Sequence, residues 1–273
     1  MKVHFLGTAA AEGFPNPYCK CQACVKAREL GGKNKRTRSS VLFDDWLKVD
    51  YPPDTMWQAD RDGIDLSLVT ELLITHTHYD HLNAGALTDR LTGYAHGVEQ
   101  PLNIYGNDLT LLKCRSELSG ETIGDDLRFH RLLPFHAVNV GEARVTPLLA
   151  DHDQREMCLL FYIEMGGKTI LYGNDTGWFP DDTWDFLAGR TIDLAILDCT
   201  TGSTGNKRQR NHMSIETVLE VGRIFREEGH VKKNSQIFVT HFSHNCRLLH
   251  EDLVEIFEPE GIQVAYDGLV THI

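Results

Sequence analysis

The sequence predicts a mixed α/β fold that is rich in strands. Short apolar runs with many β-branched or aromatic residues recur along the chain, such as "SSVLF" (39–43), "LLFYIE" (159–164) and "DLAILD" (193–198). Between several of these runs, apolar residues have helical spacing, at 107–118, 214–228 and 248–258. Strand and helix segments that alternate in this way are typical of an α/β protein.

Eight further runs complete the set of expected strands. They are "VHFL" (3–6), "LKVD" (47–50), "LLIT" (72–75), "LNIY" (102–105), "RVTPLL" (144–149), "TILYG" (169–173), "QIFVT" (236–240) and "QVAYDG" (263–268). Residues 159–173 form a hairpin candidate, because Gly166 and Gly167 supply the positive φ that a tight turn requires.

The segments 51–63, 119–126 and 200–212 are expected to be loops. No repeat, low-complexity tract or change of composition marks a linker. A single domain over 1–273 is therefore the simplest organisation.

Composition and charge restrict the classes of function. The chain has 273 residues, of which 41% are hydrophobic, so it has enough apolar matter for one large core. It lacks both a run of roughly 20 apolar residues and a leader-like start, and a cytoplasmic protein without membrane contact is expected. The formal charge of −12, from 27 basic and 39 acidic side chains, opposes stable binding to nucleic acid or anionic membrane.

The stretch "THTHYDHLNAG" (75–85) carries the clearest chemical signal. It packs His76, His78, Asp80 and His81 into six positions directly after an expected strand. Residues two apart in an extended chain point the same way, so His76 and His78 can converge on one ion. Imidazole nitrogen and carboxylate oxygen suit zinc, manganese or iron, and burying four such groups without a metal would leave polar atoms unpaired.

A second cluster, "CKCQAC", places Cys19, Cys21 and Cys24 too close together for an ordinary disulfide framework. Seven cysteines is an odd number, which favours reduced thiols. Three thiolates suit a closed tetrahedral zinc that needs one further ligand, and the alternative is three unrelated reduced cysteines.

The histidine stretch matches T-H-x-H-x-D-H-x-x-G, and the chain resembles the metallo-β-lactamase superfamily in this signature. The resemblance implies a four-layer αββα sandwich with metal ligands on loops at one edge. It also implies two divalent active-site metals. One would be held by His76, His78 and His152 and the other by Asp80, His81 and His241, with Asp175 bridging both. Asp50 resembles the aspartate that orients a ligand histidine in this superfamily.

The cysteine cluster resembles that of the PhnP-type phosphodiesterases, whose opening pattern reads "GTAAAEGFPNPYCKCQAC" here. That resemblance implies a small N-terminal loop holding a structural zinc, with His244 as its fourth ligand and Cys246 as a lower-ranked rival. It also makes His212, in "RNHMSIETV", a candidate catalytic residue beside Asp80. A plain position before a helix N-terminus, with Ser214 as the cap, is the alternative for His212.

Together these features predict a metal-dependent hydrolase that cleaves small phosphodiesters, cyclic ones in particular, through a hydroxide bridged between two metals. A homodimer is expected only from the resemblance. Four alternatives stay open: a tRNase Z-like nuclease, a thioester or lactam hydrolase, a PqqB-like cofactor-biosynthesis protein, and a non-catalytic zinc-binding scaffold. Lys207, Arg208 and Arg210 lie just before His212 and are left out of the catalytic set, because a basic run is more often solvated surface.

Overall fold

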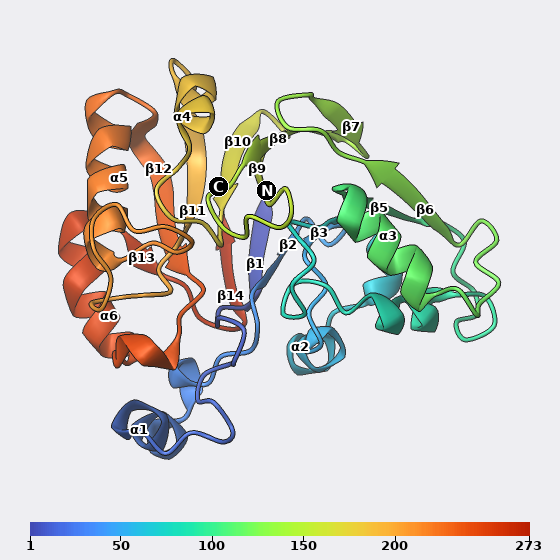
Figure 1. The fold of residues 1–273 in the computed structure, drawn as a ribbon, viewed down its shortest axis with the longest axis horizontal. Coiled ribbons are helices and arrows are strands. Elements are labelled where there is room, and N and C mark those ends of the chain that lie inside the picture. The colour runs from blue at the N-terminus through green and yellow to red at the C-terminus, as the bar shows by residue number, and fades with distance from the viewer.

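Two seven-stranded β-sheets pack face to face, and helices cover both outer faces (Figure 1). The computed structural model describes all 273 residues. The strands of the first sheet, in spatial order, are β14 (Leu269–His272), β1 (Lys2–Gly7), β2 (Ser40–Phe43), β3 (Leu47–Val49), β4 (Glu71–Leu73), β5 (Leu102–Gly106) and β6 (Leu127–Arg131). Strands β3 to β6 are parallel, whereas β14, β1, β2 and β3 pair antiparallel.

The second sheet has the same number of strands and also mixes directions. In spatial order they are β13 (Gln263–Val264), β12 (Val231–Thr240), β11 (Ile192–Asp198), β10 (Lys168–Gly173), β9 (Leu159–Met165), β8 (Ala143–Leu149) and β7 (Val138–Val140). Strands β10 to β13 are parallel, and β7 to β10 pair antiparallel. The predicted hairpin is confirmed as β9 and β10, with Gly166 and Gly167 at φ values of 56° and 73°.

Six α-helices join the strands. They are α1 (Gln22–Leu30), α2 (Thr55–Asp62), α3 (Asp108–Glu117), α4 (Asp181–Leu187), α5 (Ile215–Glu227) and α6 (His250–Phe257). Short 3₁₀ helices span Gly32–Asn34, Leu66–Leu68, Ala84–Arg90, His244–Cys246 and Glu258–Glu260. None of these helices combines the length and the apolar content that a membrane crossing requires.

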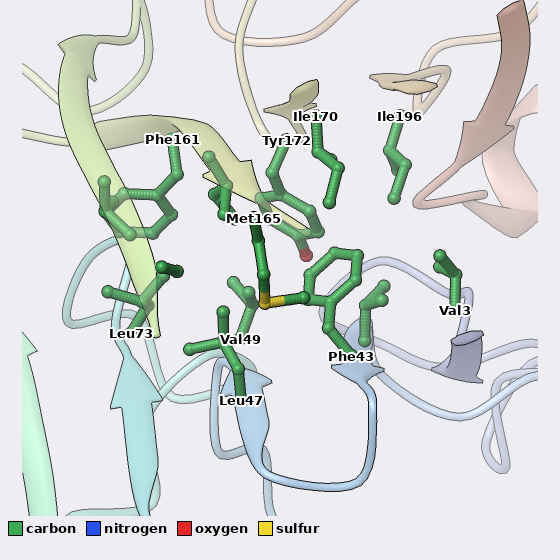
Figure 2. Close-up of a cluster of buried hydrophobic side chains, with 14 of the residues drawn as sticks. Val3, Phe43, Leu47, Val49, Leu73, Phe161, Met165, Ile170, Tyr172 and Ile196 are labelled. Carbon is green, nitrogen blue, oxygen red and sulfur yellow. The ribbon is translucent and has the colours of Figure 1, made fainter. Parts of the chain in front are cut away.

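The alternation of side chains along each strand builds the layers. In β9, Phe161 and Ile163 belong to the core between the sheets, whereas Leu160 and Tyr162 face the helices outside the second sheet. Figure 2 shows the inner core, where Phe43, Val49 and Leu73 of the first sheet face Phe161, Ile170 and Tyr172 of the second.

Each outer face is closed by its own apolar cluster. Residues of α4, α5 and α6 cover the second sheet, and residues of α3 and the 3₁₀ helix Ala84–Arg90 cover the first. The predicted four-layer αββα sandwich is therefore confirmed.

The expected loop over 51–63 is wrong, because α2 occupies most of it. Pro52 and Pro53 precede the helix, and Gly63, with a φ of 64°, ends it in the left-handed conformation. The residues that α2 buries are Thr55 and Gln58, and the Gln58 amide donates hydrogen bonds to Thr37 and Arg38. A helix attached through polar contacts has no apolar stripe, so the periodicity gave no sign of it.

The remaining helices and strands either match those expected from the sequence or were not expected. Every expected strand run contains a strand, the three expected helices appear as α3, α5 and α6, and 119–126 and 200–212 lack helix and strand. The apolar pattern did not predict α1, α4, β6, β7 or β14. The segment between β1 and β2 carries α1, which projects from the sandwich in Figure 1.

Candidate metal centre

Acid or imidazole side chains follow the ends of five strands. In the second sheet β8, β10, β11 and β12 run in the same direction, so their carboxyl ends share one edge. The side chains in question are His76, His78, Asp80 and His81 after β4, His152 after β8, Asp175 after β10, Asp198 at the end of β11, and His241 after β12.

A first donor cluster contains His76, His78, His152 and Asp175, whose metal-binding atoms all lie within 4.8 Å of one another. His78 Nδ1 lies 3.1 Å from His152 Nε2. His76 Nε2 lies 3.3 Å from Asp175 Oδ2. Three side chains of this cluster are buried, and His78 is half-buried at its mouth.

A second donor cluster contains Asp80, His81, Asp175 and His241, again within 4.8 Å. His81 Nε2 lies 2.9 Å from Asp175 Oδ2 and 3.2 Å from Asp80 Oδ2. His241 Nε2 lies 3.3 Å from His81 Nε2. Asp175 therefore belongs to both clusters, at the position that the resemblance assigns to a bridging ligand.

The spacing of these atoms fits a bound cation. Ligands about 2.0–2.1 Å from a tetrahedral ion lie roughly 3.3 Å apart, close to the separations found here. His76 Nε2 is buried without a hydrogen-bond partner, which is costly unless a cation satisfies it. The donor atoms are imidazole nitrogens and carboxylate oxygens, the set that divalent transition metals accept.

Neighbouring polar groups hold the imidazoles in place. Asp50 Oδ2 lies 2.7 Å from His81 Nδ1, and Asp50 also accepts hydrogen bonds from Thr75. Thr200 Oγ1 lies 2.7 Å from His241 Nδ1. Because these partners occupy the Nδ1 atoms, Nε2 of each ring is left for the donor cluster.

Three of these residues have backbones in the left-handed region. Asp50, Asp175 and His241 have φ values of 61°, 59° and 63°. Non-glycine residues there cost on the order of 1 kcal/mol each, and such positions gather at functional sites. At each one the chain turns directly at a strand end, which aims the side chain into the cluster.

His212 lies beside the clusters, held through one ring nitrogen. His212 Nδ1 is 3.0 Å from Asp175 Oδ1 and 3.2 Å from Asp198 Oδ2. Burial disfavours the charged ring, but the Asp175 and Asp198 carboxylates outweigh it and raise the pKa of His212 to about 11. Asp198 was missed in the sequence, although "DLAILD" ends in an acid after an apolar run, as "LKVD" does at Asp50.

A separate cluster joins Cys19, Cys21, Cys24 and His244. The Sγ atoms of Cys19 and Cys21 lie 3.6 Å and 3.8 Å from His244 Nδ1. Sulfur at about 2.3 Å and nitrogen at about 2.0 Å from a tetrahedral zinc would lie roughly 3.6 Å apart, so the fit is close.

The rival ligand Cys246 lies outside this cluster, buried with its Sγ toward the Leu248 carbonyl. The thiols that face His244 differ in acidity. A hydrogen bond from the backbone N–H of Cys24 and the nearby His244 lower the pKa of Cys21 to about 6, whereas burial raises the pKa of Cys24 to about 12.

A cavity of about 420 Å³ opens onto the donor clusters. Its floor includes His78, Asp80, His152, Asp175, His212 and His241. Its walls come from the loop after β1 (Ala10, Ala11 and Glu12), the loop after β11 (Thr200, Thr201 and Thr204) and the loop after β12 (Ser243 and Asn245). A larger surface hollow lined by charged residues of α5 lies away from all donor clusters.

The basic side chains before His212 are engaged elsewhere and do not line the cavity. Lys207 lies 3.2 Å from Glu220, Arg208 stacks over the Trp178 ring, and Arg210 lies 2.6 Å from Asp151.

Comparisons with known proteins agree with this architecture. The sequence model of the beta-lactamase superfamily domain matches residues 41–241. Coenzyme PQQ synthesis protein B of Methylobacterium radiotolerans is 28% identical over 228 residues, which is 73% of each chain. The protein of that name from Acinetobacter baumannii is 23% identical over 98% of this chain and 99% of its own.

Two solved structures share the fold over almost the whole chain. A diphosphatase from the PhnP family matches with a TM-score of 0.76 and 24% identity, covering 100% of this chain and 97% of its own. Zinc-bound PqqB from Methylobacterium extorquens matches with a TM-score of 0.76 and 20% identity, covering 100% of both chains. At these identities the likeness concerns the fold.

Proposed function

This chain belongs to the beta-lactamase superfamily domain family, and from that premise we propose that it hydrolyses small, cyclic phosphodiesters in the cavity above the two donor clusters. The observation that carries the proposal is the convergence of six donors on Asp175, with His212 beside them. The whole chain, 1–273, would act as one domain.

The residues present fit two divalent ions. His76, His78 and His152 would hold one, Asp80, His81 and His241 the other, and Asp175 would contact both. When bound, such ions lower the pKa of water toward neutrality and offset the charge of a diester. Zinc, manganese or iron suits this donor set, and zinc suits the Cys19, Cys21, Cys24 and His244 cluster.

Asp80 and His212 have distinct roles in this proposal. The Asp80 carboxylate lines the cavity and orients the attacking water through a hydrogen bond to Oδ1 or Oδ2. Asp175 and Asp198 hold His212 at Nδ1, so Nε2 is left to donate to a phosphate oxygen or to the departing alkoxide. Both roles need a diester small enough for the cavity.

The absence of a stable nucleic-acid partner and the cytoplasmic location are part of this proposal. The charge of −12 and a cavity without lysine or arginine disfavour a nuclease that holds long RNA. Seven free thiols favour a reducing compartment such as the cytoplasm.

The direct test is hydrolysis of bis(p-nitrophenyl) phosphate and a 2′,3′-cyclic nucleotide by protein loaded with zinc or manganese. A nucleoside diphosphate belongs in the panel, because one similar structure is a diphosphatase. We expect turnover of the diesters and its loss in Asp80→Ala, with Asp89→Ala, an exposed aspartate outside the cavity, as the matched control. Inertness of fully metallated protein toward every diester would overturn the proposal.

A role in coenzyme synthesis is a second candidate, because the curated relatives include coenzyme PQQ synthesis protein B. The complete donor set around Asp175 favours hydrolysis. Elemental analysis adds a check, because a zinc scaffold predicts about one tightly held metal per chain, whereas the hydrolase predicts that metal and two exchangeable ions.

A further inference from the structure

Glu12 sits where the N-terminal loop meets the cavity. The backbone N–H of Ala10 donates to the Phe242 carbonyl at 3.1 Å, and that of Phe242 donates to the Thr8 carbonyl at 2.9 Å. These bonds hold the loop after β1 beside the segment that carries His241. The Glu12 side chain lines the cavity and is 25% exposed.

The Glu12 carboxylate makes one hydrogen bond and one longer ionic contact, both through the same oxygen. The Ser243 hydroxyl donates to Glu12 Oε1, and His244 Nε2 lies 3.7 Å from that atom. Because both contacts use Oε1, Oε2 is left to accept a hydrogen bond from a molecule in the cavity. The carboxylate is therefore positioned in advance for a donor group on the substrate.

Apart from His212, which Asp175 and Asp198 hold at the donor clusters, the cavity offers no cationic side chain to a ligand. Neither lysine nor arginine lines it. The nearby guanidinium groups are already paired with carboxylates: Arg38 with Asp54 at 3.0 Å, Arg155 with Asp153 at 2.6 Å, and Arg210 with Asp151 at 2.6 Å. The remaining polar wall of Thr201, Thr204, Ser243 and Asn245 is neutral.

We propose that Glu12 is a specificity-determining residue that makes the cavity select phosphodiesters whose only charge is the reacting group and whose remote part carries hydroxyls. This inference rests on the proposed function. A hydroxyl donates to Glu12 Oε2, whereas a second phosphate meets a carboxylate with neither lysine nor arginine in the cavity to offset it.

The test compares two substrates that differ only in the remote group: adenosine 2′,3′-cyclic phosphate and its 5′-phosphorylated counterpart. Like charges in contact in a partly solvated cleft lower association by a factor of about ten or more. We expect the unmodified protein to favour the 5′-hydroxyl compound by at least that factor in kcat/KM, mainly through KM.

Glu12→Gln removes the charge but keeps the shape and an oxygen that accepts from Ser243. We expect this variant to bring the ratio of the two kcat/KM values close to one, chiefly by improving the phosphorylated substrate. Glu29→Gln, on the exposed side of α1 and outside the cavity, removes the same charge and should keep the original ratio.

Three results would overturn the inference. They are equal turnover of both substrates by the unmodified protein, an unchanged ratio in Glu12→Gln, and an equal loss for both substrates accompanied by loss of zinc, which would show a purely structural role. If the fully metallated protein cleaves neither compound nor any other diester, the proposed function fails, and the inference fails with it.

Discussion

Asp175 is the residue on which both donor clusters depend. Its Oδ2 lies 3.3 Å from His76 Nε2 and 2.9 Å from His81 Nε2, and its Oδ1 faces His212 Nδ1 at 3.0 Å. The left-handed backbone at φ 59° directs this carboxylate into the space between the imidazoles. The neighbouring histidines and the hydrogen bonds they donate, His241 and His212 first among the charges, outweigh burial and hold the pKa of Asp175 well below its usual range.

Replacing Asp175 should therefore disturb both clusters together. Asp175→Asn keeps the shape but loses the charge, and we expect kcat/KM for a diester to fall by at least about 100-fold, because even partners behind a metal ligand are worth 10- to 100-fold. Elemental analysis should show fewer exchangeable metals. Asp185→Asn, an exposed change on α4, is the control, and an unchanged metal content in Asp175→Asn would contradict the bridging role.

His212 should affect turnover and leave metal content alone. General acid catalysis contributes about 10²- to 10⁴-fold, so His212→Gln should lower kcat by a factor in that range. Metal content should stay at the unmodified value, because His212 lies outside the two assigned donor sets. A kcat within twofold of the unmodified protein would remove His212 from the mechanism.

The sequence indicates the donors and, through the resemblance, Asp50 as one residue that positions them, but it does not indicate Asp198 or Glu12. His76, His78, Asp80 and His81 are adjacent in the chain, so one motif indicates all four. Asp198 and Glu12 act through contacts with residues far away in sequence, and neither has a local pattern to distinguish it from a strand-end or loop acid. Only the folded chain brings Glu12 to Ser243.

At the scale of elements, the segment that carries α1 packs on a much smaller apolar cluster than the two sheets do. Its apolar core is a small cluster of Ala9, Phe14, Ala23, Cys24 and Ala27. So few buried groups stabilise a segment weakly, and the Cys19, Cys21, Cys24 and His244 cluster supplies the missing attachment when it holds zinc. The apolar pattern missed α1 for the same reason.

Removing two of these thiols should loosen α1 without unfolding the sandwich. In the double variant Cys19→Ser and Cys21→Ser, we expect one zinc fewer per chain and amide exchange in α1 that is at least about tenfold faster, because local opening is no longer opposed by the metal. Exchange in β9 to β11 should stay slow. Unchanged protection in α1 would show that zinc is not its main attachment.

The strand β3 contains a buried charge that predicts a dependence of stability on pH. Lys48 is fully buried, and its ammonium donates hydrogen bonds to the Ser40 hydroxyl and to the Asp50 carbonyl. Burial lowers its pKa to about 7, despite the opposing effect of Asp50. Between pH 7 and about 10 the unfolded chain holds this proton and the folded chain does not, so the destabilisation is complete below pH 7 and is relieved as pH rises.

Lys48→Met should remove that dependence. At pH 7 we expect the free energy of unfolding to rise by on the order of 3 kcal/mol relative to the unmodified protein, after allowance for the two lost hydrogen bonds. The difference between the two proteins should shrink as pH rises from about 7 to about 10, as urea unfolding at each pH would show. A constant difference across that range would contradict the buried-charge explanation.

At the scale of the whole molecule, the net negative charge and the carboxylates of the donor clusters both favour the binding of cations. The chain carries a formal charge of −12 before any metal is bound, and the carboxylates of the donor clusters add to local repulsion. The α/β class was predictable because strand-like apolar runs alternate with segments of helical spacing, whereas the four-layer arrangement was predictable only from the resemblance. The placement of β14 beside β1 was not, because pairing between the chain ends leaves no local pattern.

Metal removal should separate the two kinds of site. Dialysis against a moderate chelator should remove about two ions per chain and abolish turnover, while a third ion stays in the enclosed thiolate cluster. The melting temperature should fall and then recover as zinc or manganese is added back, because a ligand that binds only the folded state stabilises it by an amount that grows with the logarithm of its concentration. Loss of all metal in one step would contradict two classes of site.

The loop after β12 supplies the last ligand of two separate metal-binding clusters. His241 completes the second donor cluster, and His244, three residues later, completes the cysteine cluster. During synthesis, every other donor emerges from the ribosome before these two. A growing chain therefore carries incomplete sets of thiols and imidazoles until residues 241–244 have been made. A chain that stops before residue 241 would lack one ligand of each site, so neither site could be completed.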